Sequence, residues 1–96
     1  MMAKLSEEQI QMKLSELQGW TREGDAIQKT YKLPSFPAAI MFVGTVGHLA
    51  EAADHHPDIL VQWRNVTLTL STHSAGGLTE KDFQLAAQID SLPFKK

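Results

Sequence analysis

The sequence predicts a single α+β domain over residues 1–96 with the element order α-β-β-α-β-β-α. Two pairs of short segments with alternating apolar residues, each pair joined by a short turn, indicate two β-hairpins. Three segments with apolar residues at helical spacing flank and separate these hairpins. Because hairpins with segregated helices form layered α+β folds, we expect a four-stranded antiparallel sheet with the helices packed on one face.

The first helix and the first hairpin are predicted from capping and turn signals. Ser6 is followed three residues later by a glutamine, which is the spacing of a capping box, and Gly19 is placed to end the helix. The alternation of residues 27–33 indicates a half-buried strand. We expect this strand to pair with residues 20–23 across the turn at Gly24-Asp25.

The central helix is predicted from about Pro37 to Asp54. Its apolar stripe is wider than one sheet face would cover, which indicates a second contact surface. Pro57 ends the helix because the residue before a proline is pushed out of the helical region. His56 therefore belongs to the exit from the helix.

The second hairpin consists of two alternating runs, residues 59–63 and 66–70, separated by Arg64-Asn65. A two-residue turn at Arg64-Asn65 places Trp63 opposite Val66 and His56 opposite His73. The last helix is predicted to begin at Thr79, with a second capping box.

Composition and charge exclude several classes of function. Nine Lys and Arg against eleven Asp and Glu are scattered along the chain, so no direct nucleic-acid contact is expected. With no cysteine, the chain has neither disulfides nor a thiolate nucleophile. The polar start and the shortness of the longest apolar run, residues 38–46, indicate a cytoplasmic protein without a membrane segment.

Three of the four histidines, His55, His56 and His73, fall in one region of the predicted fold. Glu51 precedes His55 by four residues, so its carboxylate is expected to reach that imidazole across one helical turn. Histidine has an ordinary pKa of about 6.5, which suits a group that gives and takes protons near neutral pH. The pattern indicates a proton-transfer site without a covalent nucleophile.

Two other interpretations of these residues remain open. Paired histidines near a helix end often cap carbonyl groups or face solvent, so His-His-Pro alone is a weak signal. Glu51, His55 and His73 could instead bind a metal ion, although His55 and His56 are adjacent and no His-x-x-x-His pair is present. We expect no metal.

Three further residues are candidate contacts for a flat ligand. Trp20 and Trp63 could stack on a heterocycle, although core packing is the better expectation for Trp63. Asp82 is placed at the third position of the last helix, where capping explains it without a substrate.

The segment from Glu51 to Pro57, with the residues that follow it, resembles the signature of the pterin-4a-carbinolamine dehydratase family. The matching residues are Glu51-Ala-Ala-Asp-His-His-Pro57, Trp63, Thr72-His73, Gly76-Gly77-Leu78-Thr79 and Asp82. The similarity extends over about residues 19–90.

The resemblance implies an enzyme that dehydrates a 4a-hydroxytetrahydropterin to quinonoid dihydropterin in tetrahydrobiopterin recycling, without a cofactor. It implies catalytic roles for His55, His56 and His73, with Glu51 as the supporting carboxylate. We expect His55 and His73 to act as acid and base. Substrate contacts are expected from His56, Trp20, Trp63 and Asp82.

The resemblance also implies a homodimer or homotetramer. The alternative function is a non-catalytic oligomerisation partner, as in coactivator-like dimerisation proteins. The intact set of three histidines favours catalysis, because a scaffold has no reason to gather three imidazoles.

Overall fold

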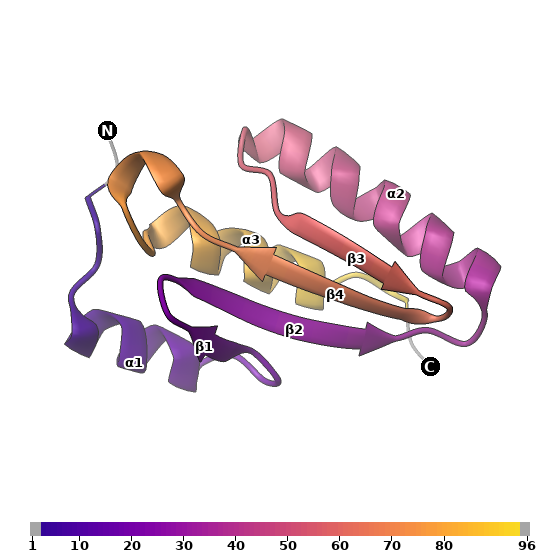
Figure 1. The fold of residues 1–96 in the computed structure, drawn as a ribbon, viewed down its shortest axis with the longest axis horizontal. Helices are drawn as coiled ribbons and strands as arrows, with labels where there is room; N and C mark the ends of the chain where they lie inside the picture. The colour runs from indigo at the N-terminus through magenta and orange to yellow at the C-terminus, as the bar shows by residue number, and fades with distance from the viewer. Residues whose placement is uncertain (1–2, 95–96) are drawn as a thin grey trace.

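The computed structural model describes residues 3–94, and it confirms the predicted fold class and element order. Figure 1 shows the helices and strands in their spatial arrangement. Their bounds are α1 (Glu7–Ser15), β1 (Thr21–Glu23), β2 (Ala26–Lys32), α2 (Phe36–Ala53), β3 (Asp58–Gln62), β4 (Asn65–Leu70), the short 3-10 helix η1 (His73–Ala75) and α3 (Glu80–Asp90).

The four strands form one antiparallel sheet in the order β1-β2-β4-β3, so β4 is central and β3 is an edge strand. One face of β4 is formed by Val66, Leu68 and Leu70, which are completely buried in the same core as α2 and α3. The other face carries threonines, among them Thr67, whose hydroxyl bonds that of Thr30 on β2. The helices therefore cover one face of the sheet, as the alternation predicted.

The two predicted capping boxes are present. Ser6 accepts a hydrogen bond from the backbone N–H of Gln9, and the Gln9 side chain accepts from the backbone N–H of Ser6. Thr79 and Asp82 are paired in the same way at the start of α3. These caps fix where α1 and α3 begin, because they satisfy N–H groups that have no partner within the helix.

Helix α2 is the one described helix that is long and apolar enough to cross a membrane by length and composition. Its buried side, formed by Ala39, Phe42, Val46 and Ala50, packs into the core of the domain. Only 22% of the helix is buried, so most of its surface lies outside the core.

The register of the second hairpin differs from the prediction by two residues. The turn lies at Trp63-Arg64 and not at Arg64-Asn65, so Val61 pairs with Val66 and Ile59 with Leu68. Trp63 adopts a left-handed backbone conformation with φ of 58°, and its side chain is 67% exposed. The expectation that Trp63 lies in the core is therefore wrong.

A partly buried polar cluster connects the end of α3 to the sheet. The Asp90 carboxylate accepts hydrogen bonds from Trp20 Nε1, from Lys29 Nζ and from the Tyr31 hydroxyl. Burial raises the pKa of the Tyr31 hydroxyl well above its usual value, and the bond to Asp90 adds to this effect. Asp90 thus connects α3 with β2 and with the residue that precedes β1.

Candidate active site

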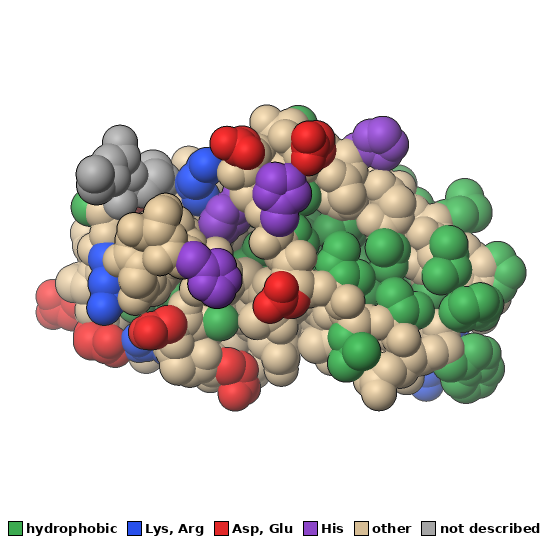
Figure 2. All heavy atoms as spheres, turned by 45° about the horizontal axis from the view of Figure 1, so that its top comes forward, with side chains coloured by type: hydrophobic (Ala, Val, Ile, Leu, Met, Phe, Trp, Pro, Cys, Tyr) green, Lys and Arg blue, Asp and Glu red, His purple; other side chains and the backbone are tan. Residues whose placement is uncertain are grey.

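The three histidines lie at the end of the sheet where β4 ends and β3 begins. His55 and His56 occupy the connection between α2 and β3, and His73 opens η1 just after β4. Figure 2 shows histidine and acidic side chains gathered on one part of the surface, and hydrophobic side chains gathered on another. The central position of β4 brings two segments that are distant in sequence to one place.

Asp54 determines how the two adjacent histidines diverge. It caps α2 in a left-handed conformation, with φ of 52° and ψ of 45°. The backbone N–H of His55 donates back to the carbonyl of Ala50, and Pro57 prevents a further helical turn. As a result, His55 is buried whereas His56 is exposed.

His55 pairs with Asp82 and not with Glu51, which corrects the expected contact across one helical turn. His55 Nε2 lies 2.5 Å from Asp82 Oδ1, and both side chains are buried. The predicted contact fails because α2 ends at Ala53, so the left-handed residue that follows directs His55 toward α3.

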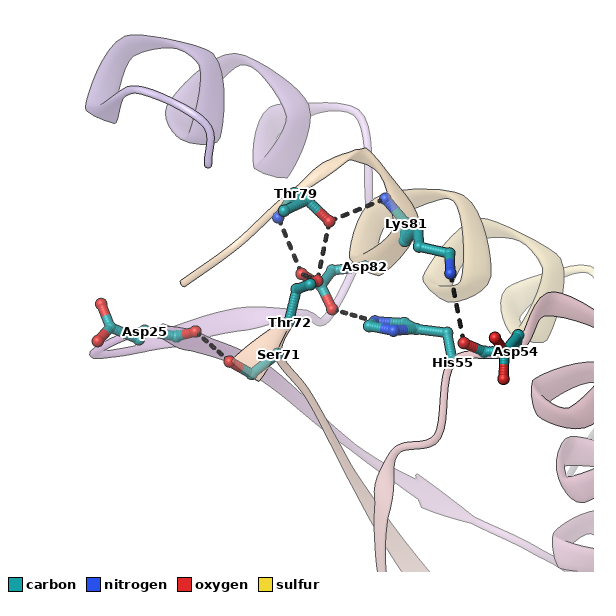
Figure 3. A network of polar contacts seen from close by, with 8 residues as sticks. All are labelled: Asp25, Asp54, His55, Ser71, Thr72, Thr79, Lys81 and Asp82. Carbon is teal, nitrogen blue, oxygen red and sulfur yellow. Dashed lines mark hydrogen bonds and ion pairs between the residues drawn. The ribbon is translucent and has the colours of Figure 1, made fainter. Parts of the chain in front are cut away.

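A chain of hydrogen bonds holds the Asp82 carboxylate in place (Figure 3). Its Oδ2 accepts from the Thr72 hydroxyl at 2.8 Å and from the backbone N–H of Thr79 at 2.9 Å. Because the single hydroxyl proton of Thr72 goes to Asp82, the bond of 2.8 Å between the two threonine hydroxyls must be donated by Thr79. Asp82 is therefore both the helix cap that was predicted and the partner of His55.

Glu51 forms its contact with the other histidine of the pair. His56 Nε2 lies 2.9 Å from Glu51 Oε1, and the two side chains are 60% and 81% exposed. An ion pair in water is weak compared with a buried one, because solvent screens its charges. Glu51 can orient His56 but holds it less firmly than Asp82 holds His55.

A cavity of about 390 Å³ joins the three histidines. His55, His56 and His73 all line it, together with Asp54, Lys81 and the stretch from Ser71 to Ser74. Lys81 Nζ donates a hydrogen bond of 3.3 Å to the backbone carbonyl of Asp54, which holds this cation at the cavity. A volume of this size falls in the range of about 300–1,000 Å³ that is typical of small-molecule sites.

The error in the predicted register does not change which histidines lie together. His56 and His73 are not directly opposed, since the observed pairing shifts by two residues, yet both line the same cavity. A shift of two residues preserves the face to which each side chain points. The grouping of the three imidazoles was therefore predicted correctly for an inexact reason.

The two tryptophans do not lie at the histidine cavity. Trp20 is buried in the core and donates to Asp90, and neither Trp20 nor Trp63 lines the histidine cavity. Trp63 lies at the opposite end of β3, on the order of 20 Å from His56 at about 3.3 Å per strand residue.

The described part of the chain does not bring together the residues that were considered as metal ligands. Within residues 3–94, no three or more His, Asp or Glu side chains are grouped as metal ligands. Glu51 and His55, two of the three residues considered, are instead paired with His56 and Asp82.

Sequence reasoning missed several residues of the site, above all Thr72, Ser71 and Lys81. One signal for Thr72 was available: it continues the core-facing parity of Leu68 and Leu70, and a polar residue on that parity needs a buried partner. Ser71 and Lys81 gave no such signal, because both fall at positions where polar residues are ordinary.

Comparison with sequence families and curated proteins gives consistent matches. The family model described as pterin 4 alpha carbinolamine dehydratase matches residues 3–92. A protein of Roseiflexus castenholzii, provisionally named a pterin-4-alpha-carbinolamine dehydratase, is 62% identical over 92 residues, covering 96% of this chain and 99% of that protein. A protein of Nocardia farcinica with the same provisional name is 59% identical over 88 residues, covering 92% and 93%.

Solved structures share the fold. The crystal structure of a transcriptional coactivator/pterin dehydratase from Brucella melitensis has a TM-score of 0.88 and 32% identity, covering 92% of this chain and 96% of that chain. A pterin dehydratase-like protein described as a RuBisCO assembly factor in the alpha-carboxysome has a TM-score of 0.63 at 22% identity, covering 80% and 89%. At that identity, the second likeness concerns the fold alone.

Proposed function

The chain belongs to the pterin-4a-carbinolamine dehydratase family, and on this basis we propose that it dehydrates 4a-hydroxytetrahydropterins by histidine acid-base catalysis. The observation that carries the proposal is the cavity of about 390 Å³ lined by His55, His56 and His73. Three imidazoles around one space can both supply and collect a proton without a bound cofactor.

The reaction requires two proton transfers and the loss of one water molecule. The lone pair on N5 of the pterin expels the hydroxyl group at C4a, and this group leaves as water after it takes a proton from an imidazolium. The resulting cation then gives a ring nitrogen proton to a neutral imidazole, which produces the quinonoid dihydropterin. Both steps are general acid-base catalysis.

The contacts of His55 suit it to one of these transfers. If Nε2–H donates to Asp82, then Nδ1 carries the lone pair and is the nitrogen available to the cavity. The carboxylate also stabilises the imidazolium when Nδ1 is protonated. Asp82 therefore acts through His55, and we retain His55 and His73 as the acid-base pair, with His56 positioning the substrate.

The basic test is the rate of dehydration with and without the protein. Purified protein and a freshly generated 4a-carbinolamine are mixed in a stopped-flow spectrometer, and the formation of quinonoid dihydropterin is compared with the spontaneous reaction. We expect a rate that rises in proportion to protein concentration. A rate equal to the spontaneous one would refute the proposed activity.

The proposal includes self-association through one apolar face. This surface, which we call the α2/β3 face, combines Phe36, Ile40 and Met41 on α2 with both sides of the edge strand β3. Ile59 lies on the helix side of β3, opposite Leu68, and Leu60 lies on its other side, opposite Thr67. The edge strand β3 carries no Lys, Arg or Pro, which are the residues that usually protect an edge from pairing, whereas the opposite edge β1 is short and charged. A second copy of the chain fits this face because β3 can pair with β3 across a two-fold axis.

The same face favours a second candidate function, the binding of another protein. The name of the Brucella melitensis protein joins coactivator and dehydratase, and an exposed apolar face supports such a role beside catalysis. We place the enzyme in the cytoplasm, in the recycling of tetrahydrobiopterin, in keeping with the reaction proposed.

A further inference from the structure

Strand β2 is paired along most of its length on one side only. β4 pairs with it from Ile27 to Lys32, whereas β1 reaches only as far as Gln28. Figure 1 shows β1 beside the first part of β2 alone. Within the described residues, no strand covers the outer side of β2 at residues 29–32, which we call the open edge.

The register of the first hairpin shows which backbone groups point outward at the open edge. Glu23 and Ala26 flank a two-residue turn, so they bond each other and the backbone groups of Ala26 point toward β1. Because this direction alternates along a strand, the N–H and C=O groups of Thr30 and Lys32 point to the same side.

The second hairpin leads to the same assignment independently. Gln62 and Asn65 flank its two-residue turn and bond each other, so the backbone groups of Asn65 point toward β3. The next residue, Val66, therefore bonds β2, where its partner is Tyr31. Since Tyr31 uses its backbone groups toward β4, its two neighbours in β2 direct theirs to the open edge.

A cavity of about 240 Å³ lies against the open edge. Residues 29–32 form one wall, and the other walls are formed by Phe42, Ile89, Asp90, Leu92 and Phe94. This volume is below the range of about 300–1,000 Å³ that is typical of small-molecule sites, and the cavity shares no lining residue with the histidine cavity. Its size and its aromatic walls suit one large apolar side chain.

A strand added to the open edge would direct one side chain into this cavity. Tyr31 lies on the helix side of the sheet, since its ring is 4.9 Å from that of Phe42 and its hydroxyl bonds Asp90. Residues directly opposite each other in neighbouring strands point to the same face. The residue of the added strand opposite Tyr31 therefore faces the rings of Phe42 and Phe94.

The charges at the open edge favour an acidic strand. Lys32 is exposed and forms no ion pair among residues 3–94, so its charge is free to meet a carboxylate. Asp90, the acid in the cavity lining, is already occupied by three donors. In an antiparallel strand, the residue opposite Lys32 directly precedes the residue opposite Tyr31.

A second copy of this chain is a poorer occupant of the open edge. Pairing two open edges about a two-fold axis would set two lysine-bearing edges against each other, and lysines on an edge oppose such pairing. Pairing β3 of one copy with the open edge of the next leaves one edge of each kind free, which gives an open filament and not a closed oligomer.

We propose that the open edge and its cavity bind an extended segment of a partner protein by addition of a strand to the sheet. The segment has an acidic residue followed directly by a large apolar residue, Phe or Leu. Backbone bonds to Thr30 and Lys32 supply affinity, whereas the cavity and the Lys32 ammonium group select the sequence. The inference is independent of the proposed function, because the open edge lies outside the histidine cavity.

Amide hydrogen exchange followed by NMR tests the open edge. In the free protein, the amides of Lys29 and Tyr31 should exchange slowly and those of Thr30 and Lys32 fast. The probe is a seven-residue peptide with blocked ends and Glu-Phe at its centre. With free peptide at about ten times its Kd, exchange at Thr30 and Lys32 should slow by about tenfold. Binding without this protection, or no binding at about 5 mM peptide, would overturn the proposal.

An exchange of charge tests the selectivity. Lys32→Glu should weaken binding of the Glu-Phe peptide and strengthen binding of a matched Lys-Phe peptide, each by about threefold to fivefold. The control Lys4→Glu makes the same change at an exposed residue outside the cavity lining and should leave the preference unchanged. A preference that Lys32→Glu keeps would remove Lys32 from the site. Protection of Thr30 and Lys32 in the protein alone, lost on dilution, would make a second copy the occupant and refute the partner.

Discussion

His55 Nε2 and Asp82 Oδ1 are 2.5 Å apart, His55 is buried except where it lines the cavity, and Asp82 has no exposed surface. Asp82 also accepts hydrogen bonds from Thr72 and from the start of α3. This relationship links the stability of a helix to the orientation of an imidazole, and the first prediction separates the two effects.

Asp82→Asn should lower kcat by roughly 10² to 10⁴-fold, the range for impaired acid-base catalysis, with little change in KM. The reason is that Asp82 is buried behind His55 and has no surface on the cavity. Steady-state kinetics, which measures kcat and KM separately, checks this expectation. The control is Ser6→Ala, which removes the capping box of α1 and should cost about 1 kcal/mol of stability without changing turnover. A rise in KM at constant kcat would instead indicate direct substrate contact by Asp82.

His73→Ala should lower the dehydration rate by roughly 10² to 10⁴-fold while the fold is retained, because the side chain is exposed on η1. Circular dichroism and thermal unfolding check the fold, and the stopped-flow assay checks the rate. His48→Ala is the matched control, since His48 is an exposed histidine on α2 outside the cavity. Equal rates for the two variants would remove His73 from the mechanism.

Glu51→Gln should reduce kcat/KM by less than about tenfold, much less than Asp82→Asn. The Glu51–His56 pair is exposed, and such pairs contribute about 0–1 kcal/mol. Raising the ionic strength should diminish the difference between Glu51→Gln and wild type, because salt screens exposed charges. A loss as large as that in Asp82→Asn would give Glu51 the role of supporting carboxylate that was expected from the sequence.

The partly buried Tyr31 leads to a prediction for alkaline pH. Burial and Asp90 raise the pKa of its hydroxyl in the folded protein, so the folded state keeps a proton that the unfolded state loses above about pH 10. The resulting stability is fully present below about pH 10 and is lost as the pH rises further. Urea unfolding from pH 8 to 11 should show a steeper loss for wild type than for Tyr31→Phe. The Lys29–Asp90 ion pair is present in both, so parallel curves would contradict the assignment.

Leu60→Lys should shift the protein from an oligomer to a monomer, as measured by sedimentation velocity. Leu60 is 53% exposed on the edge strand β3, and a lysine there opposes pairing between edge strands. Met12→Lys is the control, because Met12 is 67% exposed on α1, outside the α2/β3 face. A wild-type protein that sediments as a monomer at all concentrations would refute association through this face.

The fold followed from local patterns that the structure confirms. In the capping boxes that begin at Ser6 and Thr79, the two partners are only three residues apart in the sequence. In β4, the alternation of apolar residues and threonines separates a buried face from a threonine face. Such signals depend on neighbours in sequence, so a single sequence contains them.

The turn of the second hairpin could not be predicted in the same way. The two alternating runs are separated by Arg64-Asn65, which favoured a turn at these residues, and asparagine tolerates positive φ better than tryptophan. In the structure Trp63 takes the left-handed position, and the Arg64 guanidinium lies 4.7 Å from the centre of its ring. The Arg64 carbonyl also accepts a hydrogen bond from the backbone N–H of Leu33, a contact between distant segments that no local pattern contains.

The partner of His55 was also beyond local reasoning. The contact with Asp82 joins residues 27 positions apart, and it depends on how α3 packs beside α2. The contact predicted between Glu51 and His55 assumed that the helix continues through both residues, whereas α2 ends between them.

The pairing of β3 with β4 has a consequence for how the protein acquires its site. The walls of the histidine cavity come from the segment before β3, the segment after β4 and Lys81 on α3. A partly folded chain in which the second hairpin has formed but α3 has not packed beside it lacks one of these walls. During refolding, ligand affinity should therefore return only after α3 has packed beside the hairpin, and later than the helical signal.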